Sequence, residues 1–378
     1  MIVGRCVPAL LVVFAVAFLA IFAVPQAQAQ RRVRNDVFAV TVPVDATAAT
    51  AAAARDAARA DGQRRALRQL VERLAAPGDA ARLPRIDDAT LTNMVQDIEV
   101  ANERSSAVRY LAEYTYRFRP DAVRRLLRQA NVAFAETPSK PVVVIPVLRR
   151  GSGAVLWDEP NPWRHAWAAR KPGGLVPVIV PDGDLGDVGA IDAEQAVAVT
   201  PAALDAIAAK YGGGDILVAI ATAPGDSGGG AAAMQQVDLG GGRYAAGGKL
   251  IVPVTGSARA NPGENEADFL ARAVAAAMRP VEEAWKKETL IRSGDQGTIA
   301  VSVPVAGIDD WVAVRDRLSG LPAIRQAELL SLTRQEARLD LHYLGDPSQL
   351  RLALAQRDLV LTEGQPLWTL TRRPAAAR

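Results

Sequence analysis

The stretch that most resembles a catalytic motif is Gly225-Asp226-Ser227-Gly228-Gly229, which matches the sequence around the nucleophile in one class of serine protease. Such a serine needs a histidine base within hydrogen-bond reach and an acid that orients this base. His165 is the only histidine before Ser227, and it lies in no motif of that class. The surrounding Ala-Pro-Gly-Asp-Ser-Gly-Gly-Gly composition predicts a flexible loop. A hydrolase that uses Ser227 stays open as the alternative.

The glycine-rich run Gly240–Lys249 has some features of a phosphate-binding loop. Such a loop needs Gly-Lys followed by Ser or Thr at the start of a helix. Here Leu250 follows Lys249, and the residues after it read as a strand. The run therefore predicts a hairpin with its turn at Gly240-Gly241-Gly242 and strands at Met234–Val237 and Leu250–Val254.

The sequence predicts neither a metal ion nor a cofactor. The two histidines, His165 and His342, lie far apart and have no cysteines nearby, so they make no zinc pattern. Asp182, Asp184 and Asp187 resemble part of a calcium loop. They lack the glutamate that ends such a loop.

The most unusual segment runs from Leu156 to Trp167 and contains three tryptophans. Asn161 and Pro162 predict the first residues of a helix, which places Trp163 and Trp167 on one face. With Trp157 and Arg164 they are our candidate partner-binding residues. The alternative is that the rings pin the helix onto a central sheet, with their indole N–H groups bound to backbone oxygens.

Two further functions stay open. A hydrolase can work with carboxylates alone, for which Asp158 or Glu159 would serve. Anionic lipid or an envelope polymer could bind arginines on the helices of the first domain, although such a run is more often a solvated helix face. These arginines are Arg64, Arg65, Arg68, Arg73, Arg124, Arg125 and Arg128.

The first 29 residues have the layout of a secretory signal peptide: a positive start, an apolar run at Val7–Val24 and a small-residue cleavage site ending at Ala29. We expect cleavage and a periplasmic protein. An uncleaved signal, the alternative, would be its only membrane contact. The single cysteine, Cys6, lies in this segment. Acidic and basic residues nearly balance, with a net charge of +3, so nucleic acid is not an expected partner.

Hydrophobic periodicity predicts an α+β or α/β chain of three domains after the signal at 1–29. Residues 33–136 read as a β-α-β-β-α unit, with a long helix near Ala46–Ala76 that Gly62 bends. Residues 141–292 contain three apolar runs typical of buried strands in a central α/β domain. Residues 297–371 follow the ferredoxin-like order β-α-β-β-α-β, which ends with a strand at Leu359–Thr362.

The runs Val142–Val147 and Leu175–Pro181, the tryptophan segment and the stretch Asp309–Leu354 together resemble the bacterial domain-of-unknown-function family numbered 2066. That resemblance implies an exported protein without assigned catalytic residues. More distantly, the first two domains resemble parts of flagellar assembly protein T, and the central one the N-terminal domain of the Tol translocation protein. These likenesses imply a non-catalytic binding or assembly module whose partner is an envelope protein or a cell-wall component.

Overall fold

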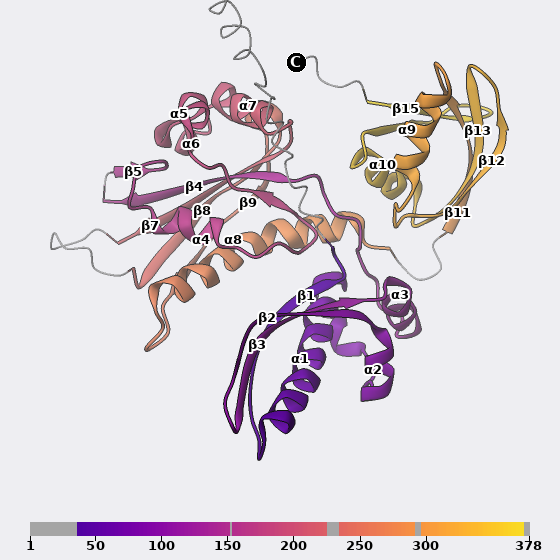
Figure 1. The fold of residues 1–378 in the computed structure, drawn as a ribbon. Coiled ribbons are helices and arrows are strands. Elements are labelled where there is room, and N and C mark those ends of the chain that lie inside the picture. The colour runs from indigo at the N-terminus through magenta and orange to yellow at the C-terminus, as the bar shows by residue number, and fades with distance from the viewer. Residues whose placement is uncertain (1–35, 152, 225–233, 292–295, 374–378) are drawn as a thin grey trace, which may run out of the picture. The chain divides into compact units, whose positions relative to one another are not determined.

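The computed structural model describes residues 36–151, 153–224, 234–291 and 296–373, which form an α+β fold with three sheets (Figure 1). The predicted signal peptide and the Ser227 segment lie outside these residues. Among the described residues, no helix is long and apolar enough to span a bilayer.

The first sheet has three antiparallel strands in the order β1-β3-β2, because β3 returns between the other two. They are β1 (Ala39–Thr47), β2 (Val95–Ser105) and β3 (Arg109–Phe118). In β3 every second residue from Tyr110 to Phe118 is buried, and α1 (Ala51–Leu74) covers that face. The other elements are η1 (Asp79–Arg82), α2 (Asp88–Met94) and α3 (Pro120–Gln129). The predicted β-α-β-β-α order is present, with α2 added.

Gly62 allows α1 to approach the sheet closely. A Cβ atom at this position would lie 2.7 Å from Cγ1 of Val44 and 2.8 Å from the hydroxyl of Tyr116. The helix runs through Gly62 as one element. Close packing against the sheet therefore explains this glycine, and the prediction that it bends the helix is wrong.

The central sheet is mixed, with the order β10-β8-β7-β4-β5, while β6 pairs with β4 and β9 with β8. Its middle strands β4 and β7 are parallel and almost wholly buried, as their apolar runs predicted. The strands are β4 (Val142–Arg150), β5 (Gly153–Val155), β6 (Val178–Ile179), β7 (Ile216–Ala223), β8 (Gln236–Tyr244), β9 (Leu250–Pro253) and β10 (Gly256–Arg259).

The glycines Gly240–Gly242 lie inside strand β8, so the prediction that they form a hairpin turn is wrong. The turn lies further on, at η2 (Ala246–Gly248). A Cβ on Gly241, whose φ is 97°, would lie 2.1 Å from the carbonyl oxygen of Val218. Glycine is needed here because β7 and β8 approach too closely for any side chain.

Five helices of the central part contact its strands or each other. They are α4 (Pro162–Ala168), α5 (Leu185–Ala190), α6 (Ala193–Val197), α7 (Pro201–Lys210) and α8 (Glu266–Thr289). The longest, α8, contains Pro280. The indole N–H of Trp285 in α8 donates to the carbonyl of Thr137 (2.8 Å), and the Lys286 ammonium donates to the carbonyl of Glu72 (2.7 Å).

The third sheet has the order β12-β13-β11-β15-β14. Its elements are β11 (Gln296–Pro304), α9 (Ile308–Leu318), β12 (Ile324–Leu332), β13 (Glu336–Leu344), α10 (Pro347–Ala355), β14 (Leu359–Thr362) and β15 (Trp368–Arg372). The ferredoxin-like order continues up to β14. Strand β15, which the sequence analysis missed, lies between β14 and β11 and is parallel to β11.

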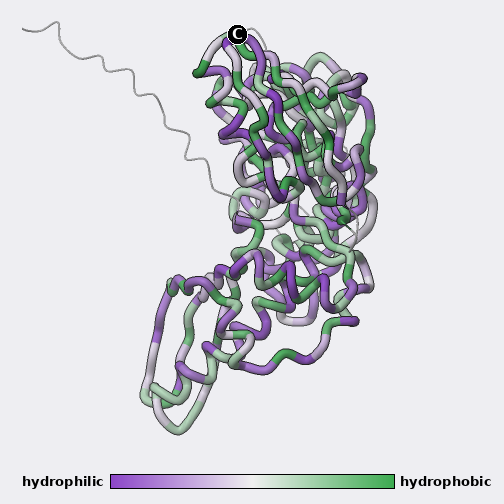
Figure 2. The backbone as a smooth tube through the Cα atoms, turned by 90° about the vertical axis from the view of Figure 1, so that its right-hand side faces the viewer, coloured by the Kyte–Doolittle hydropathy of each residue, from purple (hydrophilic) through white to green (hydrophobic). Residues whose placement is uncertain are grey.

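Figure 2 shows hydrophobic and hydrophilic stretches interspersed along the backbone. One apolar core joins the first sheet, α1 and α8 with one face of the central sheet. A second core fills the other face, under α6 and α7. Residues Val301–Leu370 contribute a core of their own.

Candidate functional site

The tryptophan helix α4 forms as its sequence predicts, because the side chain of Asn161 accepts a hydrogen bond from the backbone N–H of Arg164 and Pro162 follows it. Trp163 and Trp167 lie one turn apart, with ring centroids at 5.8 Å and an edge-to-face angle of 87°. The indole N–H of Trp163 donates to the carbonyl of Ala219 at 2.9 Å. Trp163 therefore ties helix α4 to strand β7 of the central sheet, and Trp167 packs edge-to-face against it.

Trp163 and Trp167 are 0% and 1% exposed, so neither ring can contact a partner in this conformation. The alternative, in which the rings pin the helix to the sheet, describes their burial, but its expected backbone partner for the indole N–H is present for Trp163 only: Nε1 of Trp167 is buried without a hydrogen-bond partner among the described residues. The prediction of three tryptophans on one surface fails because α4 directs its apolar face inward. Trp157 is half-buried: its N–H donates to the carbonyl of Ile191 (2.7 Å), and its ring lies against Gly183.

At the surface beside Trp157, a carboxylate and two basic side chains form one cluster. Glu159 accepts hydrogen bonds from the backbone N–H of Asn161 (2.9 Å) and from Arg164 (2.9 Å), and lies 3.0 Å from Nε2 of His165. These donors, the backbone N–H first, lower the pKa of Glu159 to about 2. Arg164 also donates to the carbonyl of Asp182 at 2.9 Å. We call Trp157, Glu159, Arg164 and His165 the tryptophan rim.

Two aspartates of the possible calcium loop, Asp184 and Asp187, are bound by protein groups. Asp187 is fully buried and accepts hydrogen bonds from Lys210 (2.6 Å), the hydroxyl of Tyr211 (3.0 Å) and the backbone N–H of Gly183 (2.9 Å). Asp184 also pairs with Lys210 and caps α5. Burial, with the bond to Asp187, raises the pKa of Tyr211 to about 12. These carboxylates hold α5 to α7, and a lysine stands where an ion would be needed.

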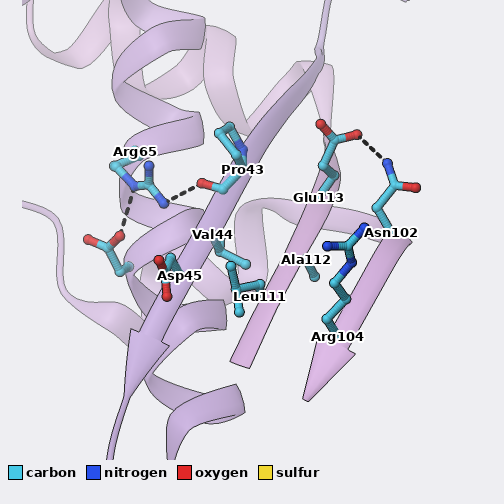
Figure 3. Close-up of a pocket in the computed structure, with 10 residues that line it drawn as sticks. Pro43, Val44, Asp45, Arg65, Asn102, Arg104, Leu111, Ala112 and Glu113 are labelled. Carbon is cyan, nitrogen blue, oxygen red and sulfur yellow. Dashed lines mark hydrogen bonds and ion pairs between the residues drawn. The ribbon is translucent and has the colours of Figure 1, made fainter. Parts of the chain in front are cut away.

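A second candidate surface, which the sequence analysis missed, is a hollow of about 690 Å³ on the first sheet (Figure 3). We call it the sheet hollow. Its floor comes from residues that alternate away from α1: Pro43 and Asp45 of β1 oppose Glu113 and Leu111 of β3. Asn102, Arg104, Asp61, Arg65, Val44 and Ala112 complete its lining. The alternation of residues along β3 was the available signal in the sequence, because it places Leu111 and Glu113 on the face that points away from α1.

Ion pairs hold the acidic side chains of the sheet hollow. Asp45 accepts two hydrogen bonds from Arg109, at 2.9 and 2.6 Å, which lower its pKa. The ammonium of Lys171 bonds to Glu113 and lowers the pKa of that carboxyl. Arg65 donates to the carbonyl of Pro43 (2.7 Å) and thereby fixes the edge of the hollow (Figure 3).

Several arginines of the proposed lipid-binding group serve the fold. Arg73 donates to the carbonyls of Val37 (2.8 Å) and Ala39 (2.7 Å). Arg124 donates to the buried Glu136 at 2.8 Å, and Arg64 pairs with Asp88 at 2.5 Å. Arg68, Arg125 and Arg128 are exposed.

Comparison with known proteins gives one match. A family model described as a domain of unknown function (DUF8605) matches residues 34–136, the segment that forms the first sheet with α1, α2 and α3. No curated protein and no solved structure matches this chain. A domain of unknown function is thus confirmed, while the number 2066 and the likenesses to flagellar and Tol proteins are not. Within the described residues, no group of three or more His, Cys, Asp or Glu side chains is placed to hold a metal ion.

Proposed function

We propose that this protein is a non-catalytic binding or assembly module of the bacterial envelope, and that the sheet hollow is its contact site for an envelope protein. The apolar export signal supports the location. The partner would lie over the apolar side chains of Pro43 and Leu111, beside the paired carboxylates of Asp45 and Glu113. Fixed, paired charges give specificity in recognition, since a partner must match their positions.

The observation that carries this proposal is that hydrogen-bond donors hold carboxylates at both candidate surfaces: Arg109 on Asp45 and Lys171 on Glu113 in the sheet hollow, and Arg164 on Glu159 in the tryptophan rim. The pKa values of Asp45, Glu113 and Glu159 are all lowered by hydrogen-bond donors or cations. A hydrolase with two carboxylates needs one with a raised pKa, so that it stays protonated and can donate its proton. Carboxylates that stay ionised suit recognition better than acid–base chemistry.

A crosslinking experiment tests the proposed contact. A photo-reactive amino acid replaces Leu111 at the floor of the hollow in cells that export the protein. We expect one discrete adduct with an envelope protein, which mass spectrometry identifies, and loss of this adduct when Arg104→Glu reverses a charge at the border. The same photo-reactive group at Leu185, which is 93% exposed and lies in α5, is the matched control.

Two results would contradict the proposal. Equal crosslinking from positions 111 and 185 would mean that the sheet hollow selects no partner. Labelling of Ser227 by a fluorophosphonate probe, with turnover lost in Ser227→Ala, would instead support the hydrolase alternative.

A further inference from the structure

We propose that strand β12 binds an extended segment of another protein, which pairs with its free edge, places apolar side chains in the adjoining groove and sets a basic residue opposite Glu328. This site lies in residues 296–373 and is independent of the sheet hollow. Its success or failure leaves the proposed function untouched.

Strand β12 is an edge strand, at the margin of the third sheet in Figure 1. Among the described residues it pairs only with β13. Every residue from Arg325 to Leu332 is exposed, including Leu329 (45%), Leu330 (56%) and Leu332 (42%). An edge strand of this length that carries exposed leucines is a template for pairing with another chain.

The backbone groups of Ala327 and Leu329 face the open side of the sheet. The N–H of Leu344 donates to the carbonyl of Ala323, and the N–H of Thr333 donates to the carbonyl of Glu336, both at 2.8 Å. Bonded and non-bonded pairs alternate between antiparallel strands, so the even-numbered residues 336–344 of β13 bond to β12. Residues 327 and 329 oppose the odd-numbered 341 and 339, and so their own N–H and C=O groups point outward.

A groove of about 460 Å³ adjoins this edge on the helix side of the sheet. The side chains of Ala327 and Leu329 face it, because they lie opposite the buried Leu341 and Leu339. Helix α9 forms the other wall. The apolar lining consists of Trp311, Leu318, Ile324, Ala327, Leu329 and Leu339. An added strand would place every second side chain in this groove, which is the source of specificity in such complexes.

The charges on the face of the sheet opposite the groove indicate which residue the bound segment should carry there. Glu328 lies directly opposite Asp340, so two carboxylates stand side by side at the edge. The nearest base to Glu328 is His342, whose Nε2 is 4.0 Å from its Oε2. Like charges on opposing strands are destabilising. A lysine or arginine on the incoming strand would relieve this repulsion.

The same carboxylates disfavour a second copy as the occupant. A two-fold antiparallel pairing centred on Glu328 would match Ala327 with Leu329 and Ile324 with Leu332, and thus keep the groove face apolar. It would also place two Glu328 side chains opposite each other, with an Asp340 beyond each. Four carboxylates in one row oppose that dimer at neutral pH.

The test uses the full chain and two synthetic nine-residue peptides that alternate threonine and valine and begin with threonine, so that the central residue lies on the face opposite the valines. One peptide has lysine at its central position and the other has glutamate there. We expect the lysine peptide to bind about five-fold more tightly in fluorescence anisotropy, a factor typical of one exposed charge pair. Hydrogen exchange with mass spectrometry should show protection of residues 324–332 by the lysine peptide.

Two variants separate charge from backbone pairing. Glu328→Lys, an exposed change, should reverse the preference so that the glutamate peptide binds more tightly. Ala327→Pro removes an outward N–H and should weaken both peptides at least ten-fold, while an unchanged circular dichroism spectrum verifies the fold. Equal affinities in the Glu328→Lys variant, or protection elsewhere in the chain, would overturn the proposal. So would a peptide-free dimer in sedimentation velocity that Ala327→Pro abolishes.

Discussion

At the scale of single residues, the chemistry of this chain depends on what each charged or aromatic group touches. The sequence predicted the helix that carries Trp163 and Trp167, because Asn161 and Pro162 are strong signals for a helix start. It could not show which side of that helix faces the sheet, since α4 has only seven residues and tryptophan suits both a core and a contact surface. The sheet hollow was also missed, because it joins residues far apart in the chain.

Trp163→Ala should destabilise the protein by about 3–5 kcal/mol, the usual cost of removing a large buried aromatic ring. The ring is fully buried, and loss of its N–H would leave the carbonyl of Ala219 without this donor. Denaturant unfolding followed by circular dichroism measures the change. Trp157→Ala, at a half-buried ring of the same type, is the control and should cost clearly less. Equal costs would contradict the packing role given to Trp163.

Glu159 should make stability depend on pH in the acid range. Its pKa is lowered from 4.5 to about 2 in the folded protein, so its contribution is complete above about pH 4.5 and is lost as the pH falls towards 2. Glu159→Gln should therefore be less stable than the wild type at pH 6, and this difference should shrink between pH 4.5 and pH 2. Urea midpoints across this range measure it, and a difference independent of pH would refute the assignment.

At the scale of elements, hydrophobic periodicity predicted most helices and strands, since strict alternation, as in β3, and short apolar runs, as in β4 and β7, are typical of strands. The failures involve close approach and pairing order. Glycine in the sequence indicates a turn as readily as a strand that passes near another backbone, which is the case at Gly241. Strand β15 is short and pairs with residues some 67 positions earlier, such as Val301 with Trp368. Local patterns do not determine such pairing.

Gly62→Ala should destabilise the first domain by about 1–3 kcal/mol, although alanine favours helices by about 1 kcal/mol, because the new methyl group would overlap Val44 and Tyr116. Gly189→Ala in helix α5 is the matched control, since no atom lies within 4 Å of its added methyl group. That variant should be neutral or slightly stabilised. Thermal unfolding of both measures the contrast, and a stabilised Gly62→Ala would show that α1 does not approach the sheet this closely.

At the scale of the whole molecule, the distribution of apolar cores predicts how the chain unfolds. The three domains inferred from the sequence do not correspond one to one with cores, because one core includes residues of both the first and the central segment. The C-terminal residues have a separate core of Val301–Leu370. The extent of a core depends on contacts between distant segments, which periodicity does not show.

Residues 296–373 produced alone should fold, since their core is complete within this segment. We expect native-like circular dichroism and one cooperative unfolding transition. The matched fragment 36–136 lacks α8, which shares its core, and should be less stable than the same residues in the full chain. A disordered C-terminal fragment would contradict this division.

Strand β15 also has a consequence for the timing of biosynthesis. It lies between β11 and β14, so a nascent polypeptide that has emerged only as far as Thr362 lacks the strand with which β14 pairs. The five-stranded sheet can therefore be completed only after Arg372 has been added to the chain. During translation, the earlier strands of this sheet lack their full set of native partners until the residues from Trp368 onward have been made.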